Sequence, residues 1–121
     1  MASSAPVLVV EDDRDVRESL VAVLEDAGYP VISAADGRAA LDLLRAGPRP
    51  SVILLDLMMP VMDGFEFRAE QVRDPSLADV PVVVFTAGWY PVELGGRLQV
   101  DGYLTKPIRV DALLDLVSRF Q

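Results

Sequence analysis

Short, nearly continuous apolar runs recur along the chain at the length of β-strands. Most of them lack the alternation of apolar and polar residues typical of a sheet with one solvated face, so they predict strands that are buried on both faces. Strands of this kind belong to parallel sheets covered by helices on both sides. The predicted strands are Val7–Val10, Tyr29–Ala34, Val52–Leu55, Val80–Phe85 and Gly102–Leu104.

The segments between these runs carry apolar residues at the three- and four-residue spacing of amphipathic helices. A last segment with the same spacing closes the chain. The predicted apolar stripes are Val16, Leu20, Val23, Leu24 and Ala27; Ala40, Leu41 and Leu44; Phe65, Ala69 and Val72; and Val110, Leu113, Leu114, Val117 and Phe120.

Helix-capping residues stand near the ends of these segments. Asp15 with Glu18 forms a possible capping box at the start of the first helix, and Gly28 occupies the place of its C-terminal cap. Asp36 and Asp63 can cap the next two helices. The capping signals therefore support the helices that the apolar spacing predicts.

Five strands in alternation with five helices predict an α/β fold, with residues 1–121 forming one doubly wound domain. The expected strand order is the flavodoxin-like 2-1-3-4-5. The fourth helix, Pro91–Gln99, has the weakest signal, because Gly95 and Gly96 each cost about 1 kcal/mol relative to Ala in a helix interior. This helix is expected to be short or irregular.

Composition narrows the possible chemistry. The chain contains no Cys and no His, which excludes thiolate sites, imidazole acid–base catalysis and a phosphohistidine on this chain. Its net charge of −8 disfavours direct nucleic-acid binding. The N-terminus lacks a cationic, apolar targeting segment and no apolar run reaches the length of a membrane span, so a cytoplasmic location is expected.

The polar residues that remain gather at the carboxyl ends of the predicted strands. Acidic residues 11–13 follow the first strand, Asp56 follows the third, Thr86 the fourth and Lys106, the only lysine, the fifth. Ligands of open parallel sheets bind outside this edge, where the first and third strands adjoin. Neighbouring strands lie about 4.8 Å apart, which brings Asp13 and Asp56 within reach of one cation. Oxygen ligands without His or Cys, and with room for water, favour Mg²⁺.

An aspartate nucleophile, a hard cation, a hydroxyl and an ammonium group together favour phosphoryl transfer to a carboxylate, with Asp56 as the acceptor. The motifs that carry these groups resemble the receiver domains of two-component response regulators, and the resemblance covers essentially the whole chain. The matching segments are VLVVEDD at 7–13, VILLDLMMPVMDG at 52–64, VVVFTA at 82–87 and YLTKP at 103–107.

The resemblance implies that Asp56 accepts a phosphoryl group from a phosphohistidine on a partner histidine kinase or phosphotransfer protein. It also implies that Asp12 and Asp13 hold Mg²⁺, together with Asp56 and the backbone carbonyl of Met58. Such a domain catalyses its own phosphorylation and slow dephosphorylation, but acts chiefly as a switch in a phosphorelay that is read by a downstream protein target.

Three further roles follow from the same resemblance. Thr86 would bind a phosphoryl oxygen, Lys106 would pair with the phosphoryl group, and Tyr103 would be an aromatic switch coupled to Thr86. Pro107 would follow a cis peptide bond that aims Lys106. Taken alone, a tyrosine at the place of Tyr103 is more often part of the core than a switch.

Three other functions compete with the phosphorylation switch. The first is a docking module that keeps the fold but no longer signals by phosphate. Its support is the irregular segment 88–100, where Gln99 replaces a glycine common in the family. A dehalogenase-type phosphatase would need a second aspartate where Met58 stands. A flavin-binding domain would place its phosphate against the acids that follow the first strand. The kinase, the output, the oligomeric state and the question of a stand-alone protein or an excised domain stay open.

Overall fold

The computed structural model describes residues 5–59, 61–87 and 100–121. Five parallel strands form one sheet in the order β2-β1-β3-β4-β5, which confirms the predicted sheet. The observed ends of several strands differ from the predicted ones by two residues, because the apolar runs do not mark where pairing stops. The strands are β1 Val7–Val10, β2 Val31–Ala34, β3 Val52–Asp56, β4 Val82–Ala87 and β5 Gly102–Lys106.

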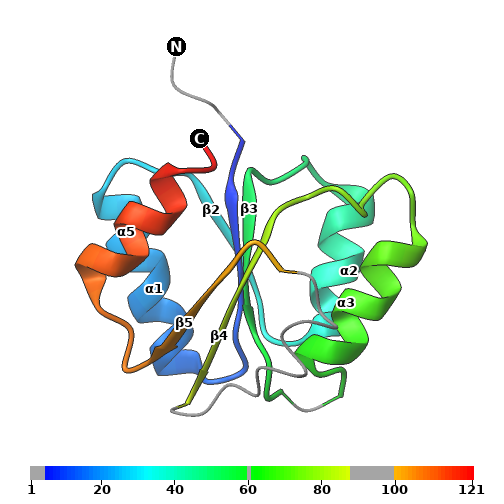
Figure 1. Cartoon of the computed structure of the whole chain (residues 1–121), viewed down its shortest axis with the longest axis horizontal. Helices are drawn as coiled ribbons and strands as arrows, with labels where there is room; N and C mark the ends of the chain where they lie inside the picture. The colour runs from blue at the N-terminus through cyan, green and yellow to red at the C-terminus, as the bar shows by residue number, and fades with distance from the viewer. Residues whose placement is uncertain (1–4, 60, 88–99) are drawn as a thin grey trace.

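Helices cover both faces of this sheet. In Figure 1, α1 and α5 lie on one side of the strands, and α2 and α3 on the other. The predicted fourth helix, Pro91–Gln99, lies outside the described residues. In the part of the chain that the structure describes, no helix is long and apolar enough to cross a membrane. The helices are α1 Arg14–Asp26, α2 Gly37–Ala46, α3 Gly64–Arg73 and α5 Val110–Ser118.

The central strands are buried on both faces, as their continuous apolar runs predict. Every residue of β1 and β3 is buried. Alternate residues enter opposite clusters: Leu8 and Val10 pack with the side chains of α2 and α3, whereas Val7 and Val9 pack with those of α1 and α5. The side-chain period of two residues in a strand thus divides one apolar run between two cores.

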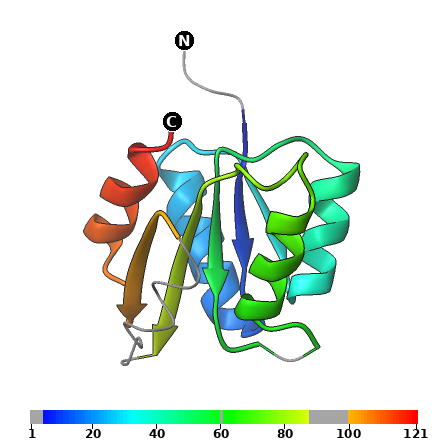
Figure 2. The same ribbon diagram turned by 45° about the vertical axis from the view of Figure 1, so that its right-hand side comes forward.

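Figure 2 shows the visible arrowheads of the strands pointing to one edge of the sheet, away from both termini. The carboxyl ends of β1, β3, β4 and β5 meet at this edge, because all four strands are parallel neighbours. The connections from β1 to α1 and from β3 to α3 start there. Polar residues that follow these strands are therefore brought together by the topology alone.

Helix caps agree with the sequence at three of four positions. Asp36 and Asp63 cap α2 and α3, and Gly28 follows α1 with φ +95°, a left-handed conformation that glycine adopts without strain. The capping box predicted for Asp15 with Glu18 is wrong. The N-cap of α1 is Asp13, whose side chain accepts hydrogen bonds from the backbone N–H groups of Asp15 and Val16.

The predicted apolar stripe of α3 is also wrong in part. Ala69 and Val72 are exposed, and the buried side chains are those of Phe67, Arg68 and Gln71. Arg68 donates to Gln71 Oε1 at 2.7 Å. The Gln71 amide in turn donates to the carbonyl oxygens of residues 77 and 80, at 2.9 and 3.1 Å. These bonds allow polar side chains to occupy the buried face, because each buried polar group has a partner.

Candidate functional site

Three carboxylates converge at the carboxyl edge of the sheet. Glu11 and Asp12 follow β1, and Asp56 ends the neighbouring strand β3. One oxygen from each carboxylate lies within 4.8 Å of the other two. Glu11 is fully buried and Asp56 is 2% exposed, whereas Asp12 faces solvent. The cluster thus has a buried floor and one open side.

Lys106, at the end of β5, supplies the positive charge of this pocket. Its Nζ lies 2.8 Å from Glu11 Oε1 and 3.5 Å from Asp56 Oδ2. The ammonium group also lies 5.4 Å from the centre of the Phe85 ring. Burial lowers the pKa of Lys106, but the hydrogen bond to Glu11 and the negative charges of Asp56 and Glu11 outweigh it, so the net pKa is raised. Lys106 therefore carries its charge throughout the physiological pH range.

One oxygen of Glu11 lacks a hydrogen-bond partner in the part of the chain that the structure describes. Oε2 is buried and, among the described residues, accepts no hydrogen bond. Burial raises the pKa of Glu11 above its ordinary value of 4.5, and Asp56 raises it further, which Lys106 only partly offsets. A buried carboxylate oxygen without a donor is costly. A cation in the pocket would satisfy it.

The donor set matches a hard divalent cation. The three candidate ligands offer carboxylate oxygens only, and the exposed side of the pocket at Asp12 leaves room for water. A site of this type, with few protein ligands and space for several waters, suits Mg²⁺. The pocket therefore fits the cation that the sequence predicts, although one of its predicted ligands is different.

Asp13 is not part of the cluster. Its Oδ1 accepts from the backbone N–H groups of Asp15 at 2.9 Å and Val16 at 3.1 Å, so the side chain is directed onto the first turn of α1. Glu11 takes its place beside Asp56. The position of Glu11 directly after the last buried residue of β1 is the signal that sequence reasoning missed.

The other predicted site residues surround Asp56. The backbone N–H of Met58 donates to Asp56 Oδ1 at 3.1 Å, while the Met58 side chain is 70% exposed. Thr86 is buried near the end of β4, one position beyond Phe85, the register partner of Asp56. The peptide bond between Lys106 and Pro107 is cis, as predicted.

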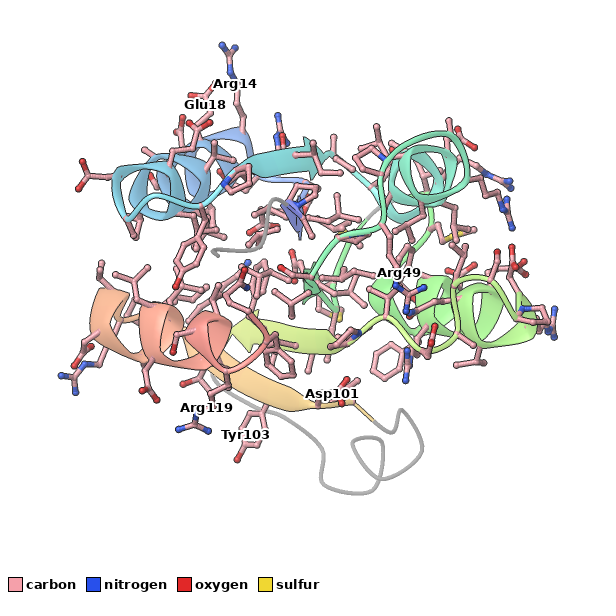
Figure 3. All side chains as sticks on the ribbon, turned by 90° about the horizontal axis from the view of Figure 1, so that it is seen from above. Arg14, Glu18, Arg49, Asp101, Tyr103 and Arg119 are labelled. Carbon is pink, nitrogen blue, oxygen red and sulfur yellow. The ribbon has the colours of Figure 1, made fainter. Side chains whose placement is uncertain are left out.

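Tyr103 lies on the surface. Its side chain is 57% exposed, and Figure 3 shows it pointing outward from β5. A position in the core, the ordinary place for a strand tyrosine, is thereby excluded. The role of Tyr103 as an aromatic switch stays a prediction.

In the loop after Asp56, Gly64 packs closely against the backbone of Asp56 and Leu57. A Cβ atom on Gly64 would lie 2.8 Å from the Asp56 carbonyl oxygen and 2.8 Å from the Leu57 Cα. The N–H of Gly64 donates to the Leu57 carbonyl at 3.0 Å, and Asp63 with Glu66 closes a capping box on α3. Only glycine fits here without a shift of the backbone that carries Asp56.

The raised pKa of Glu11 predicts an unusual pH dependence of stability in metal-free solution. From pH 4.5 up to the raised folded-state pKa, the folded protein binds more protons than the unfolded chain, so the free energy of unfolding falls as the pH rises. Glu11→Gln removes this titration while its amide oxygen can still accept from Lys106. The variant should be more stable than wild type at neutral pH, and its stability should change less over this window. Urea denaturation in chelator between pH 4.5 and 8 measures both, and an equal or steeper loss in the variant would contradict the assignment.

Comparison with known proteins agrees with this geometry. Residues 7–118 match the response regulator receiver domain family. Response regulator MprA of Mycolicibacterium vanbaalenii is 46% identical over 110 residues, which cover 89% of this chain and 46% of that protein. MprA of Mycobacterium tuberculosis is 43% identical over 113 residues, covering 92% and 48%. The chain spans about half the length of these relatives.

Solved structures give the same result. The chemotaxis protein CheY4 of Vibrio cholerae superposes with a TM-score of 0.89 at 35% identity, covering 98% of this chain and all of that one. The signal receiver domain of a signal transduction histidine kinase from Syntrophus aciditrophicus gives 0.84 at 31% identity, covering 96% and 89%. The chain belongs to the response regulator receiver domain family.

Proposed function

We propose that this chain is a phosphorylation-activated switch in which Asp56 accepts a phosphoryl group from a phosphohistidine of a histidine kinase or histidine phosphotransfer protein. One observation carries the proposal: Asp56 is a buried carboxylate held between two other acids and the Lys106 ammonium. Its Oδ1 is oriented by the Met58 N–H, and its Oδ2 faces Lys106. A carboxylate oriented in this way is a suitable nucleophile for phosphorus.

The transfer breaks the P–N bond of the phosphohistidine and forms a P–O bond to an Asp56 oxygen. The imidazole leaves with the bonding electron pair and is protonated at that nitrogen. The product is an acyl phosphate on Asp56. Lys106, whose raised pKa keeps it charged, attracts the phosphoryl oxygens and balances their charge.

The residues that would hold Mg²⁺ are Glu11, Asp12 and Asp56, with the backbone carbonyl of Met58 as a further ligand suggested by the family. Asp13 is left out of this set because its carboxylate caps α1. The bound cation would neutralise negative charge on the phosphoryl oxygens. It would also relieve the repulsion among the three carboxylates, which at about 5 Å is roughly 3 kcal/mol per pair at an effective dielectric constant of 20.

The partner would reach Asp56 over the open edge of the sheet. A groove of about 330 Å³ borders Lys106 and is lined by side chains of α1 and of the connection from β5 to α5, among them Val16, Ser19 and Ile108. A partner protein can pack against this mainly apolar surface. The downstream target is proposed to be a protein, since the net charge of −8 disfavours nucleic acid, and the proposed location is the cytoplasm.

We propose that the Thr86 hydroxyl binds an oxygen of the phosphoryl group and that the Tyr103 ring changes its orientation as a result. The Thr86 hydroxyl stands near the end of the strand next to Asp56, and a phosphoryl oxygen would draw it toward the pocket. Thr86→Ala should still be phosphorylated, but the amide chemical shift of Tyr103 should no longer change on phosphorylation. Thr105→Ala is the matched control, because Thr105 is the exposed register partner of Thr86 on β5. If the Tyr103 amide shift changed equally on phosphorylation in wild type and Thr86→Ala, the proposed coupling would be wrong.

The chemical identity of the product tests the proposed function. Incubation with acetyl phosphate or phosphoramidate and Mg²⁺ should add one phosphoryl group per chain. An acyl phosphate survives brief acid but is hydrolysed by base, which should return the original mass. Hydroxylamine attacks the acyl carbon and releases phosphate, so it should leave a hydroxamate on the aspartate. A base-stable phosphate would indicate an ester on a hydroxyl side chain and would refute the carboxylate acceptor.

A further inference from the structure

A single arginine holds the backbone of the acid loop that follows β1. The Nη1 of Arg17, on the first turns of α1, donates to the Glu11 carbonyl oxygen at 2.9 Å and to the Asp12 carbonyl oxygen at 3.4 Å. The backbone N–H of Arg17 donates to the Asp13 carbonyl at 2.9 Å. One residue thus binds three consecutive carbonyl oxygens, and two of these belong to residues of the carboxylate cluster.

This use of a guanidinium differs from that of most arginines in the part of the chain that the structure describes. Most arginines of the described part of the chain pair with a nearby carboxylate, whereas the hydrogen bonds of the Arg17 side chain go to backbone oxygens, with no ion pair among the described residues. Arg17 is half-buried, and Glu11 is fully buried. A buried carbonyl needs a donor, and Arg17 supplies it for Glu11. The ion-paired arginines are Arg14, Arg45, Arg49, Arg73, Arg109 and Arg119.

Other contacts hold the two ends of this loop, and Arg17 holds the two carbonyl groups between them. The N–H of Glu11 is fixed by the Ala34 carbonyl of β2, at 3.1 Å, and Asp13 is fixed by its cap of α1. Between these two anchors, the peptide planes after Glu11 and Asp12 set the directions in which both side chains leave the backbone, and Lys106 further holds the Glu11 carboxylate. Arg17 contacts the oxygen of each of these planes.

We propose that Arg17 is a positioning residue that fixes the peptide planes of Glu11 and Asp12 and so preorganises their carboxylates for a divalent cation. The inference rests on the proposed function, because the cation belongs to it. Residues that orient metal ligands through hydrogen bonds typically contribute 10- to 100-fold to metal affinity. Arg17 would act in this way through the backbone, without touching the cation.

Loss of the Arg17 charge and loss of its positioning role predict opposite changes in Mg²⁺ affinity, which makes the inference testable. Removal of a positive charge beside three carboxylates strengthens the attraction of a cation, so electrostatics alone predicts that Mg²⁺ binds the Arg17→Met variant more tightly. Loss of positioning predicts weaker binding. Met retains most of the length of the apolar stem and the backbone N–H that binds Asp13, so the change is confined to the two side-chain hydrogen bonds and the charge.

The experiment is a Mg²⁺ titration followed by backbone amide NMR shifts, on wild type and on variants whose spectra show a folded chain. Arg17→Met should bind Mg²⁺ about tenfold more weakly than wild type. Arg17→Lys keeps the charge but has a single donor nitrogen without the planar fork, and should fall between the two. Arg14→Met is the matched control: it removes the same charge from the same helix, its partner is Glu18, and Figure 3 shows Arg14 extending away from the body of the molecule. Its Mg²⁺ affinity should equal that of wild type or exceed it slightly.

Equal or tighter binding in Arg17→Met would overturn the inference, and so would an equal loss in Arg14→Met. If Arg17→Met does not fold, Arg17→Lys decides, and wild-type affinity in that variant would overturn the inference. The proposed function fails separately: a wild-type chain without any Mg²⁺ response would refute the metal site and the role of Arg17 together, whereas a wild-type response that Arg17→Met retains would refute the role of Arg17 alone.

Discussion

Asp56→Asn will abolish phosphorylation of the chain by acetyl phosphate. An amide oxygen is a poor nucleophile, and within the described ranges no other carboxylate shares the contacts of Asp56 with both Lys106 Nζ and the Met58 N–H. The fold should remain, because asparagine is nearly isosteric and removes one of three mutually repelling charges. Intact-mass spectrometry measures the loss, and thermal unfolding without Mg²⁺ should give a melting temperature equal to that of wild type or higher.

The matched control for this variant is Asp63→Asn. Asp63 stands on the same connection between β3 and α3, and its side chain accepts from the Glu66 N–H as the N-cap of α3. Asparagine is an equally good N-cap, so stability should change little. Phosphorylation of this control should be unaffected. Equal labelling of Asp56→Asn and wild type would refute Asp56 as the acceptor.

The second large effect distinguishes the roles of Asp12 as a metal ligand and Asp13 as a helix cap. Asp12→Ala should weaken Mg²⁺ binding at least tenfold, because it removes a carboxylate of the cluster. Asp13→Ala should leave Mg²⁺ binding nearly unchanged but lower the free energy of unfolding by about 1 kcal/mol, the usual cost of a lost N-cap. Thermal unfolding with and without Mg²⁺ measures both effects. At ten times the Kd, the cation should add about 1.4 kcal/mol in wild type and in Asp13→Ala, and far less in Asp12→Ala.

The reverse pattern would contradict this assignment. A Mg²⁺ increment that disappears in Asp13→Ala but persists in Asp12→Ala would return the metal ligand to Asp13, as the sequence alone predicts. Loss of the increment in both variants, with equal destabilisation, would indicate that the acid loop unfolds as a unit.

The sheet was predictable because burial on both faces leaves a direct trace in the sequence. A central parallel strand has no solvated face, so β1 and β3 read as unbroken apolar runs. Their order follows from the doubly wound topology, and the gathering of Asp56, Thr86 and Lys106 at one edge follows from parallel pairing. These features depend on backbone geometry, which the pattern of apolar residues determines.

The errors arose where side-chain direction decides the outcome. Three consecutive acids at 11–13 follow β1, and the sequence does not tell which of them face the pocket. The structure directs Glu11 into the pocket and Asp13 onto the amide groups of α1. In α3, a search for apolar residues overlooks Gln71 and Arg68, which are buried because their polar groups find partners on the same helix or on the backbone of the segment that follows it. Hydrogen bonds of this kind leave no trace in the pattern of apolar residues.

The pocket of Glu11, Asp12, Asp56 and Lys106 is proposed to be a Mg²⁺-dependent phosphoacceptor site. Its most direct test is fragment mass mapping of the wild-type chain after acetyl phosphate treatment, carried out once with Mg²⁺ and once with chelator. One phosphoryl group is expected on Asp56 with Mg²⁺, and almost none with chelator. A phosphoryl group on any other residue, or equal labelling of Asp56 without the cation, would contradict this proposal.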